Sequence, residues 1–161
     1  MNIDEVKKFV KEKHENQTRI QGTPYYLHPY AVADILKENG YGTDYQITAL
    51  FHDLIEDTNT TYEELLNISN QEITDAVKLL TKEKDYQMKD YITRINDNKL
   101  AKPVKLADRL HNLSEAHYAS SKWIKKYIIE TKEWYYDLAK DTIFENDINK
   151  YINELEQQIA N

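Results

Sequence analysis

The residues of this 161-residue chain that are best suited to chemistry lie in one octapeptide, FHDLIEDT, which runs from Phe51 to Thr58. One imidazole and three carboxylates fall within six of its residues: His52, Asp53, Glu56 and Asp57. If the octapeptide continues a helix, these four groups share one side of it, because helical residues advance by about 100° each. The leucine and isoleucine side chains then face the core. Three carboxylates so close together repel one another, and either solvent or a bound cation can relieve the repulsion.

Two other segments each carry a residue that could join this group. In TPYYLHPYAV, His28 precedes Pro29, which favours an extended backbone at a helix entrance and lets the imidazole reach toward another helix. In VKLADRLHNL, Asp108 lies between apolar positions of a predicted helix, and Asn112 follows one turn later on the same face. Taken singly, His28 is better explained as a capping or packing histidine, and Asp108 as a surface group or as a partner of Arg109.

Together these residues offer two imidazoles and two carboxylates, and no thiolate, because the sequence has no cysteine. Such a set suits a borderline-hard divalent ion, and carboxylate-rich ligation favours Mn²⁺, with Fe²⁺ or Zn²⁺ as alternatives. A divalent ion would offset the crowded negative charge. It would also lower the pKa of a bound water, so that hydroxide forms near neutral pH. The opposing interpretation is an acidic surface in solvent, which is the usual explanation of a His-Asp pair.

The composition limits the classes of protein to consider. A formal net charge of −7 argues against non-specific nucleic-acid binding, which needs a basic surface, although a local group of cations or a metal could still attract a small anionic substrate. No run of about 18 apolar residues is present, so no membrane-spanning helix is predicted. The N-terminal segment lacks the apolar block of a secretory signal, and the absence of cysteine suits the cytoplasm. We therefore expect a cytoplasmic protein with one domain, residues 1–161, and the sequence does not indicate its oligomeric state.

The elements that must position these residues are all predicted to be helices, because apolar residues recur with helical spacing and no segment alternates long enough for a strand. We expect helices at Ile3–Lys13, Pro29–Lys37, from Thr43 or Asp44 to about Asp57, at Tyr86–Asn96, from Pro103 onward, at Trp123–Leu138 and at Phe144–Ile159. Two further helices are predicted from capping boxes, Thr60–Glu63 and Ser69–Glu72. The fold class is therefore all-α, a globular packing of about eight or nine helices.

The same motifs resemble the HD superfamily of metal-dependent phosphohydrolases. Their flanks, GTPYYLHPYAVADIL, ALFHDLIEDT, LLTK and VKLADRLHNL, are similar to the hydrolase domain of RelA/SpoT-type alarmone enzymes and to the small stand-alone alarmone hydrolases. The resemblance runs from about Arg19 to Asn112, and more loosely to Ala139. It implies an all-α HD fold with one Mn²⁺ held by four residues, His28, His52, Asp53 and Asp108. It also implies hydrolysis of (p)ppGpp at the 3′ position, giving GDP or GTP and pyrophosphate.

The resemblance implies roles for further residues. Glu56 and Asp57 match the two acids beside the metal-bound water, where they would activate water and transfer protons. Arg19 matches a nucleotide-contacting arginine, and Asn112 matches a polar residue that binds phosphate or ribose. From the residues themselves, Tyr25 could stack on a base, and Lys105 or Lys82 could either bind phosphate or lie in solvent. Arg109 could bind phosphate or pair with a neighbouring acid.

Departures from the pattern leave two alternatives. Ile20 follows Arg19 where the longer enzymes usually have lysine, and Glu115 replaces an expected small hydroxyl residue. These departures favour, as an alternative, an HD phosphohydrolase that acts on another nucleotide. A non-catalytic nucleotide-binding module is the third interpretation, although no expected ligand or acid is missing. Of the other histidines, His111 is interpreted as structural or as supporting the site without binding metal or substrate, and His14 and His117 as surface groups.

Overall fold

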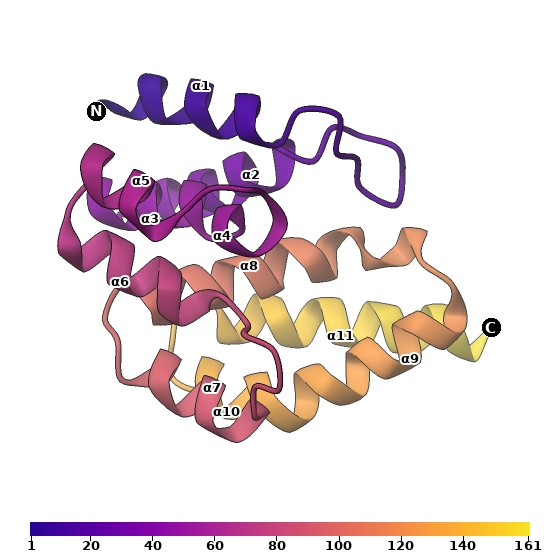
Figure 1. Ribbon diagram of the computed structural model, residues 1–161. Coiled ribbons are helices and arrows are strands. Elements are labelled where there is room, and N and C mark those ends of the chain that lie inside the picture. The colour runs from indigo at the N-terminus through magenta and orange to yellow at the C-terminus, as the bar shows by residue number, and fades with distance from the viewer. The chain divides into compact units, whose positions relative to one another are not determined.

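The computed structural model describes all residues, 1–161, and it is helical throughout (Figure 1). The α-helices run from α1 to α11, joined by a 3₁₀ segment, η1, and a π-helical segment, η2. Two of them, α4 and α10, have four residues each, so nine α-helices are longer than a single turn. The one extended pairing is an isolated bridge between Thr18 and Pro24. The predicted all-α fold is confirmed.

The chain divides into two compact units, Met1–Lys105 and Leu106–Asn161. The first contains α1 (Ile3–Lys13), α2 (Leu27–Glu38), α3 (Thr43–Phe51), α4 (Leu54–Asp57), α5 (Tyr62–Ile68), α6 (Gln71–Leu80) and α7 (Met88–Asn96). The second contains η1 (Ala116–Tyr118), α9 (Ser121–Glu130), η2 (Thr131–Tyr135), α10 (Tyr136–Ala139) and α11 (Glu145–Ala160). Helix α8 (Ala101–Glu115) begins in the first unit and ends in the second. A single domain over residues 1–161 stays a prediction.

In the first unit, α3 lies at the centre of the packing, in contact with α1, α2 and α6. Its last five residues, Ile47 to Phe51, are all buried. Burying a side chain such as Leu50 or Phe51 stabilises the fold by about 1.5–3 kcal/mol, so the end of α3 is firmly held. The backbone of His52, which follows Phe51, therefore lies beside the buried core.

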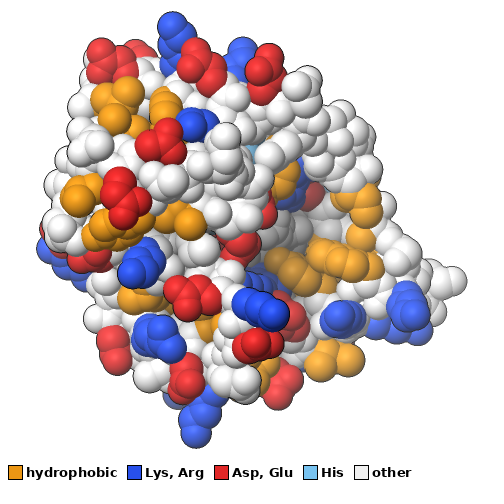
Figure 2. All heavy atoms as spheres, viewed as in Figure 1, with side chains coloured by type: hydrophobic (Ala, Val, Ile, Leu, Met, Phe, Trp, Pro, Cys, Tyr) orange, Lys and Arg blue, Asp and Glu red, His pale blue; other side chains and the backbone are white.

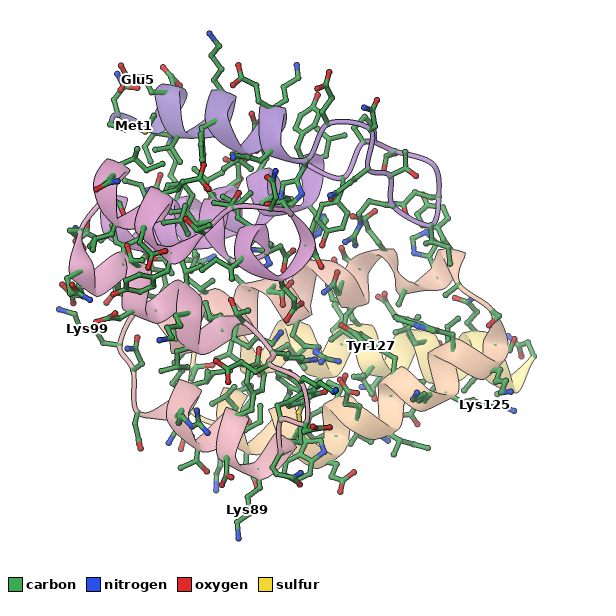
Figure 3. The ribbon with its side chains drawn as sticks, in the orientation of Figure 1. Met1, Glu5, Lys89, Lys99, Lys125 and Tyr127 are labelled. Carbon is green, nitrogen blue, oxygen red and sulfur yellow. The ribbon has the colours of Figure 1, made fainter.

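The second unit is assembled around α11, which packs against α9, α10 and η1. One buried cation lies inside it. The guanidinium of Arg109 donates to Glu130 at 2.7 Å and to Thr131 at 3.2 Å, and it lies over the rings of Tyr127 and Tyr135. Figure 3 labels Tyr127 on α9. Arg109 is therefore used inside this unit, and it is not the phosphate-binding surface group that the sequence left open.

Helix starts differ from the predictions in a consistent way. Pro29 and Pro103 were expected as first residues, but each is the third residue of its helix, α2 and α8. The first turn tolerates proline throughout, because its N–H groups have no intrahelical partner. The prediction that Pro29 keeps His28 extended is wrong, because His28 is helical and its N–H donates to Tyr25 O at 2.9 Å.

The helix caps are also displaced from the predicted positions. Thr61 caps α5 in a capping box with Glu64, one residue later than expected, and Asn70, not Ser69, caps α6. Gly42 precedes α3, whereas Thr43 or Asp44 was the expected cap. Neighbouring polar residues offer similar capping atoms, so the pattern locates a helix start only to within a residue.

Candidate metal centre and acid cluster

The predicted helix from residue 44 to residue 57 is interrupted at His52 and Asp53, so the prediction of one continuous helix is wrong. Helix α3 ends at Phe51 and α4 starts at Leu54. The side chain of His52 explains the break, since its Nδ1 lies 2.5 Å from Ala49 O, the carbonyl to which Asp53 N–H would bond in a regular helix. A side chain that donates to a helical carbonyl competes with the backbone N–H that would otherwise donate to it.

The hydrogen bond to Ala49 O also fixes the protonation of the His52 ring. A carbonyl can only accept, so Nδ1 carries a proton, and Nε2 is the ring nitrogen that could bind a metal. This is the arrangement found in metal-binding histidines, where the second ring nitrogen is held by a protein acceptor. Nε2 lies 3.0 Å from Asp53 Oδ2, so these two adjacent residues place a nitrogen and an oxygen donor atom side by side.

His28 joins them from the first turn of α2. Its Nε2 lies 3.7 Å from Asp53 Oδ2, and its ring centroid lies 5.3 Å from that of His52. Both imidazoles are buried, with 1% and 4% of their surface exposed. The packing of α2 against α3 thus brings together three of the predicted ligands.

This donor set fits a divalent ion. Ligand bonds of about 2.1 Å place neighbouring donor atoms roughly 3 to 3.5 Å apart, close to the separations of the two imidazole nitrogens from the Asp53 oxygen. Two neutral imidazoles and a carboxylate, with no thiolate, are ligands of borderline-hard ions.

Three carboxylates form an acid cluster beside these ligands. Asp53, Glu56 and Asp57 each place one oxygen within 4.8 Å of the others. Glu56 Oε1 accepts a 2.7 Å hydrogen bond from the backbone N–H of Lys82, in the segment after α6. Loss of hydration, and then the charges of Asp53 and Glu56, raise the pKa of Asp57 to about 6. The cluster therefore contains a carboxyl group that can exchange a proton near neutral pH.

Tyr25 connects the ligand group to the acid cluster. Its hydroxyl donates to Asp53 Oδ2 at 2.7 Å and approaches Asp57 Oδ2 at 3.4 Å. Its ring lies 4.9 Å from that of His14 and 5.9 Å from that of His28. Tyr25 was predicted to stack on a base, and its carboxylate contacts are a role that the sequence did not suggest.

His14 is a second residue that the sequence misjudged. It was predicted to lie on the surface, yet only 1% of it is exposed. It is the C-terminal capping residue of α1, and its Nδ1 lies 2.8 Å from Gln17 Oε1. The sequence signal that could have indicated this contact is the three-residue spacing of His14 and Gln17 at the end of an amphipathic helix.

The predicted substrate contacts in the first unit lie at two places. Arg19 lies in the loop between α1 and α2, with its guanidinium 5.9 Å from the Tyr25 ring. Lys105 lies on α8, with its Nζ 5.7 Å from the Tyr91 ring, and Lys82 lies 5.6 Å from the same ring.

A pocket of about 500 Å³ opens between α6 and α7, and none of the predicted site residues lines it. Figure 2 shows both signs of charge interspersed over the visible face.

The second unit carries the remaining predicted residues. Asp108 is buried, with 5% of its surface exposed, and its Oδ1 accepts a 3.1 Å hydrogen bond from Asn112 Nδ2. His111 Nε2 contacts Glu115 Oε1 at 2.8 Å, and the role of His111 stays a prediction.

Comparisons with known proteins place the chain in a family. A model of the HD domain family matches residues 7–102. The chain belongs to the HD domain family. Over 144 residues this HD domain is 36% identical to guanosine-3′,5′-bis(diphosphate) 3′-pyrophosphohydrolase MESH1 of Danio rerio, covering 82% of this chain and 79% of the relative.

Two further relatives extend the comparison. This HD domain protein is 35% identical over 141 residues to the bifunctional (p)ppGpp synthase/hydrolase SpoT of Escherichia coli strain K12, covering 80% of this chain but only 20% of that protein. A solved structure of a metazoan ortholog of SpoT that hydrolyzes ppGpp matches 94% of this chain and 93% of its own, with a TM-score of 0.81 at 24% identity. The predicted HD fold is confirmed, and the roles of individual site residues stay predictions. No helix combines the length and apolar character that a membrane span requires.

Proposed function

We propose that this HD domain hydrolyses the 3′-pyrophosphate of (p)ppGpp, with Mn²⁺ as its cofactor. The observation that carries the proposal is the convergence of two buried imidazoles, His28 and His52, on Asp53 beside a cluster of carboxylates. Membership of the HD family and the names of the relatives, MESH1 and SpoT, support the substrate. Carboxylate-rich nitrogen and oxygen ligation supports Mn²⁺ over Zn²⁺.

Asp108 is proposed as the fourth ligand. Its support is the HD motif pattern, together with its burial and its place on α8, which starts in the first unit. A buried carboxylate is costly unless a cation or hydrogen-bond donors compensate it, and a divalent ion would add to the hydrogen bond that Asp108 accepts from Asn112.

The reaction joins water to the phosphorus attached to O3′ and breaks the bond between that phosphorus and O3′. The leaving O3′ takes a proton, and pyrophosphate departs from GDP or GTP. A divalent ion bound to the four ligands would lower the pKa of the attacking water.

Asp57 and Glu56 are proposed to have separate roles in proton transfer and in orienting the water. Asp57, whose pKa is raised to about 6, suits proton transfer between the water and O3′, because efficient acid-base groups have a pKa near the working pH. Glu56, held by the Lys82 N–H, suits orienting the water.

The substrate contacts are proposals from the family pattern and from charge. Arg19 and Asn112 would contact the nucleotide, and Lys105 would contact phosphate. Tyr25 is proposed to hold the carboxylates through its hydroxyl, while its ring lies beside Arg19. A net charge of −7 supports a small nucleotide over nucleic acid, and a nucleotide substrate supports a cytoplasmic location.

One observation favours the second candidate, hydrolysis of another nucleotide. Ile20, beside Arg19, is 74% exposed where a lysine would add a phosphate or base contact. A panel of nucleotides incubated with the protein and Mn²⁺ separates the two candidates. Pyrophosphate release from ppGpp that stops with a chelator is expected, whereas cleavage of other nucleotides alone would reject the alarmone substrate.

A further inference from the structure

We infer that His14 and Gln17 are positioning residues that hold Tyr25 and the end of α4, and through them the oxygens of Asp53 and Asp57. The inference rests on the proposed function and assigns this pair a task that neither the motifs nor the comparisons assign. Both residues lie at the end of α1 and in the loop after it, outside the ligand and acid motifs.

The orientation of Gln17 follows from its two partners. Its side-chain amide nitrogen donates to Asp57 O at 2.9 Å, and a backbone carbonyl can only accept. The amide oxygen must therefore face His14, whose Nδ1 lies 2.8 Å away. Nδ1 of His14 consequently carries the proton and donates it, so two consecutive hydrogen bonds run from His14 through Gln17 to Asp57.

The carbonyl at the end of this relay belongs to the last residue of α4. Carbonyls in the last turn of a helix have no intrahelical partner. A four-residue helix between an interruption and a loop has little stability of its own. The Gln17 amide therefore fixes the backbone that carries the Asp57 carboxyl.

A second contact leads from His14 to Asp53. The His14 ring lies against the Tyr25 ring, with centroids 4.9 Å apart, and Tyr25 N–H donates to Gln17 O at 2.8 Å. The Tyr25 hydroxyl then donates to Asp53 Oδ2 at 2.7 Å. One imidazole thus supports both the ligand carboxylate and the acid cluster.

Packing alone does not account for a histidine at this position. Nε2 of His14 is buried and has no hydrogen-bond partner. A buried acceptor without a donor costs free energy, which a phenyl ring in the same space would avoid. What imidazole adds over phenyl is the Nδ1 donor. Burial lowers the pKa of His14, which agrees with a neutral ring.

The test uses the full chain and four variants. His14→Phe keeps a ring against Tyr25 but removes the donor, and Gln17→Met removes the amide at similar length. His14→Asn restores a donor near the Nδ1 position. Gln46→Met is the matched control, because Gln46 also donates from its side chain to a backbone carbonyl, Tyr41 O at 3.1 Å, away from the acids.

Two readouts are measured beside the melting temperature: the Kd for Mn²⁺ by electron paramagnetic resonance without substrate, and kcat and KM for ppGpp. Mutation of a residue that supports a metal ligand typically lowers metal affinity or activity about 10- to 100-fold. We expect His14→Phe and Gln17→Met to weaken Mn²⁺ binding and lower kcat by about 10-fold or more while KM stays within about twofold. His14→Asn recovers part of both losses, and Gln46→Met matches the wild type.

The outcomes distinguish an error in the proposed substrate from an error in the positioning roles of His14 and Gln17. If the wild type binds Mn²⁺ but releases no pyrophosphate from ppGpp, the substrate is wrong, and the Mn²⁺ Kd values still decide the positioning roles. Wild-type Mn²⁺ Kd and kcat in both His14→Phe and Gln17→Met would overturn the inference. So would equal losses in Gln46→Met, because the effect would then be a general one on folding.

Discussion

At the residue scale, His52 uses its two ring nitrogens for different tasks. Nδ1 donates to the carbonyl of Ala49 where α3 ends, and Nε2 faces Asp53, where it is proposed to bind the metal. The same hydrogen bond thus accounts for the break in the helix and for the orientation of the proposed ligand.

Replacing Asp53 with asparagine tests the ligand role. Asparagine keeps an oxygen that can accept from Tyr25 but removes one of three crowded charges. We expect the metal-free protein to melt at the same temperature or higher, whereas kcat falls by more than about 100-fold, beyond the usual effect of groups outside the coordination shell. Steady-state kinetics and calorimetry of the variant measure both, and retained turnover would remove Asp53 from the ligand set.

His14 is expected to make the free energy of unfolding fall as the pH is lowered. Burial lowers the pKa of His14 below its ordinary value of 6.5, so the unfolded chain binds this proton more tightly than the folded one. The stability contribution is therefore present above pH 6.5 and is lost as the pH falls below it. Denaturant unfolding from pH 7.5 to 5.5 should show the wild type losing stability relative to His14→Asn, at no more than about 1.4 kcal/mol per pH unit. Parallel curves for the two proteins would contradict a buried neutral His14.

At the element scale, much of the arrangement could be predicted. The apolar spacing predicts α1 with its observed ends, Ile3 and Lys13, and the prolines locate α2 and α8 to within two residues. The interruption after Phe51 could not be predicted from spacing, because it depends on one side chain reaching one carbonyl. For the same reason the contacts of His14 and Tyr25, which join distant segments, were missed.

The segment after α6 offers a test of how Glu56 is oriented. Lys82→Pro removes the N–H that donates to Glu56, whereas Lys82→Ala keeps it and removes only the amine. Thr81 has a ψ of 121°, which is compatible with a following proline. We expect kcat for Lys82→Pro to be about 10-fold below that for Lys82→Ala, the loss of one charge-assisted hydrogen bond. Equal kcat values would show that this N–H does not serve the reaction.

At the scale of the whole molecule, binding of Mn²⁺ is linked to the free energy of unfolding, because an ion that binds only the folded chain stabilises it. If Asp108 is the fourth ligand, Mn²⁺ binds the complete folded chain and not the unfolded one. Free Mn²⁺ at about 100 times its Kd then raises the free energy of unfolding by about 2.7 kcal/mol, or roughly 5–10 °C in melting temperature.

Asp108→Asn should reduce that rise, and the exposed Asp147→Asn in the same unit is the control. Scanning calorimetry with and without Mn²⁺ measures the shift for each protein. A rise in Asp108→Asn equal to that of the wild type would confine the metal centre to the residues of the first unit.

The central proposal is tested by ³¹P nuclear magnetic resonance of ppGpp that has been incubated with the wild-type protein and Mn²⁺ and then freed of the ion. We expect the 3′-pyrophosphate resonances to disappear as equal amounts of pyrophosphate and 5′-GDP form, with the 5′-diphosphate intact. Release of orthophosphate, cleavage at the 5′ position, or unchanged ppGpp would contradict it.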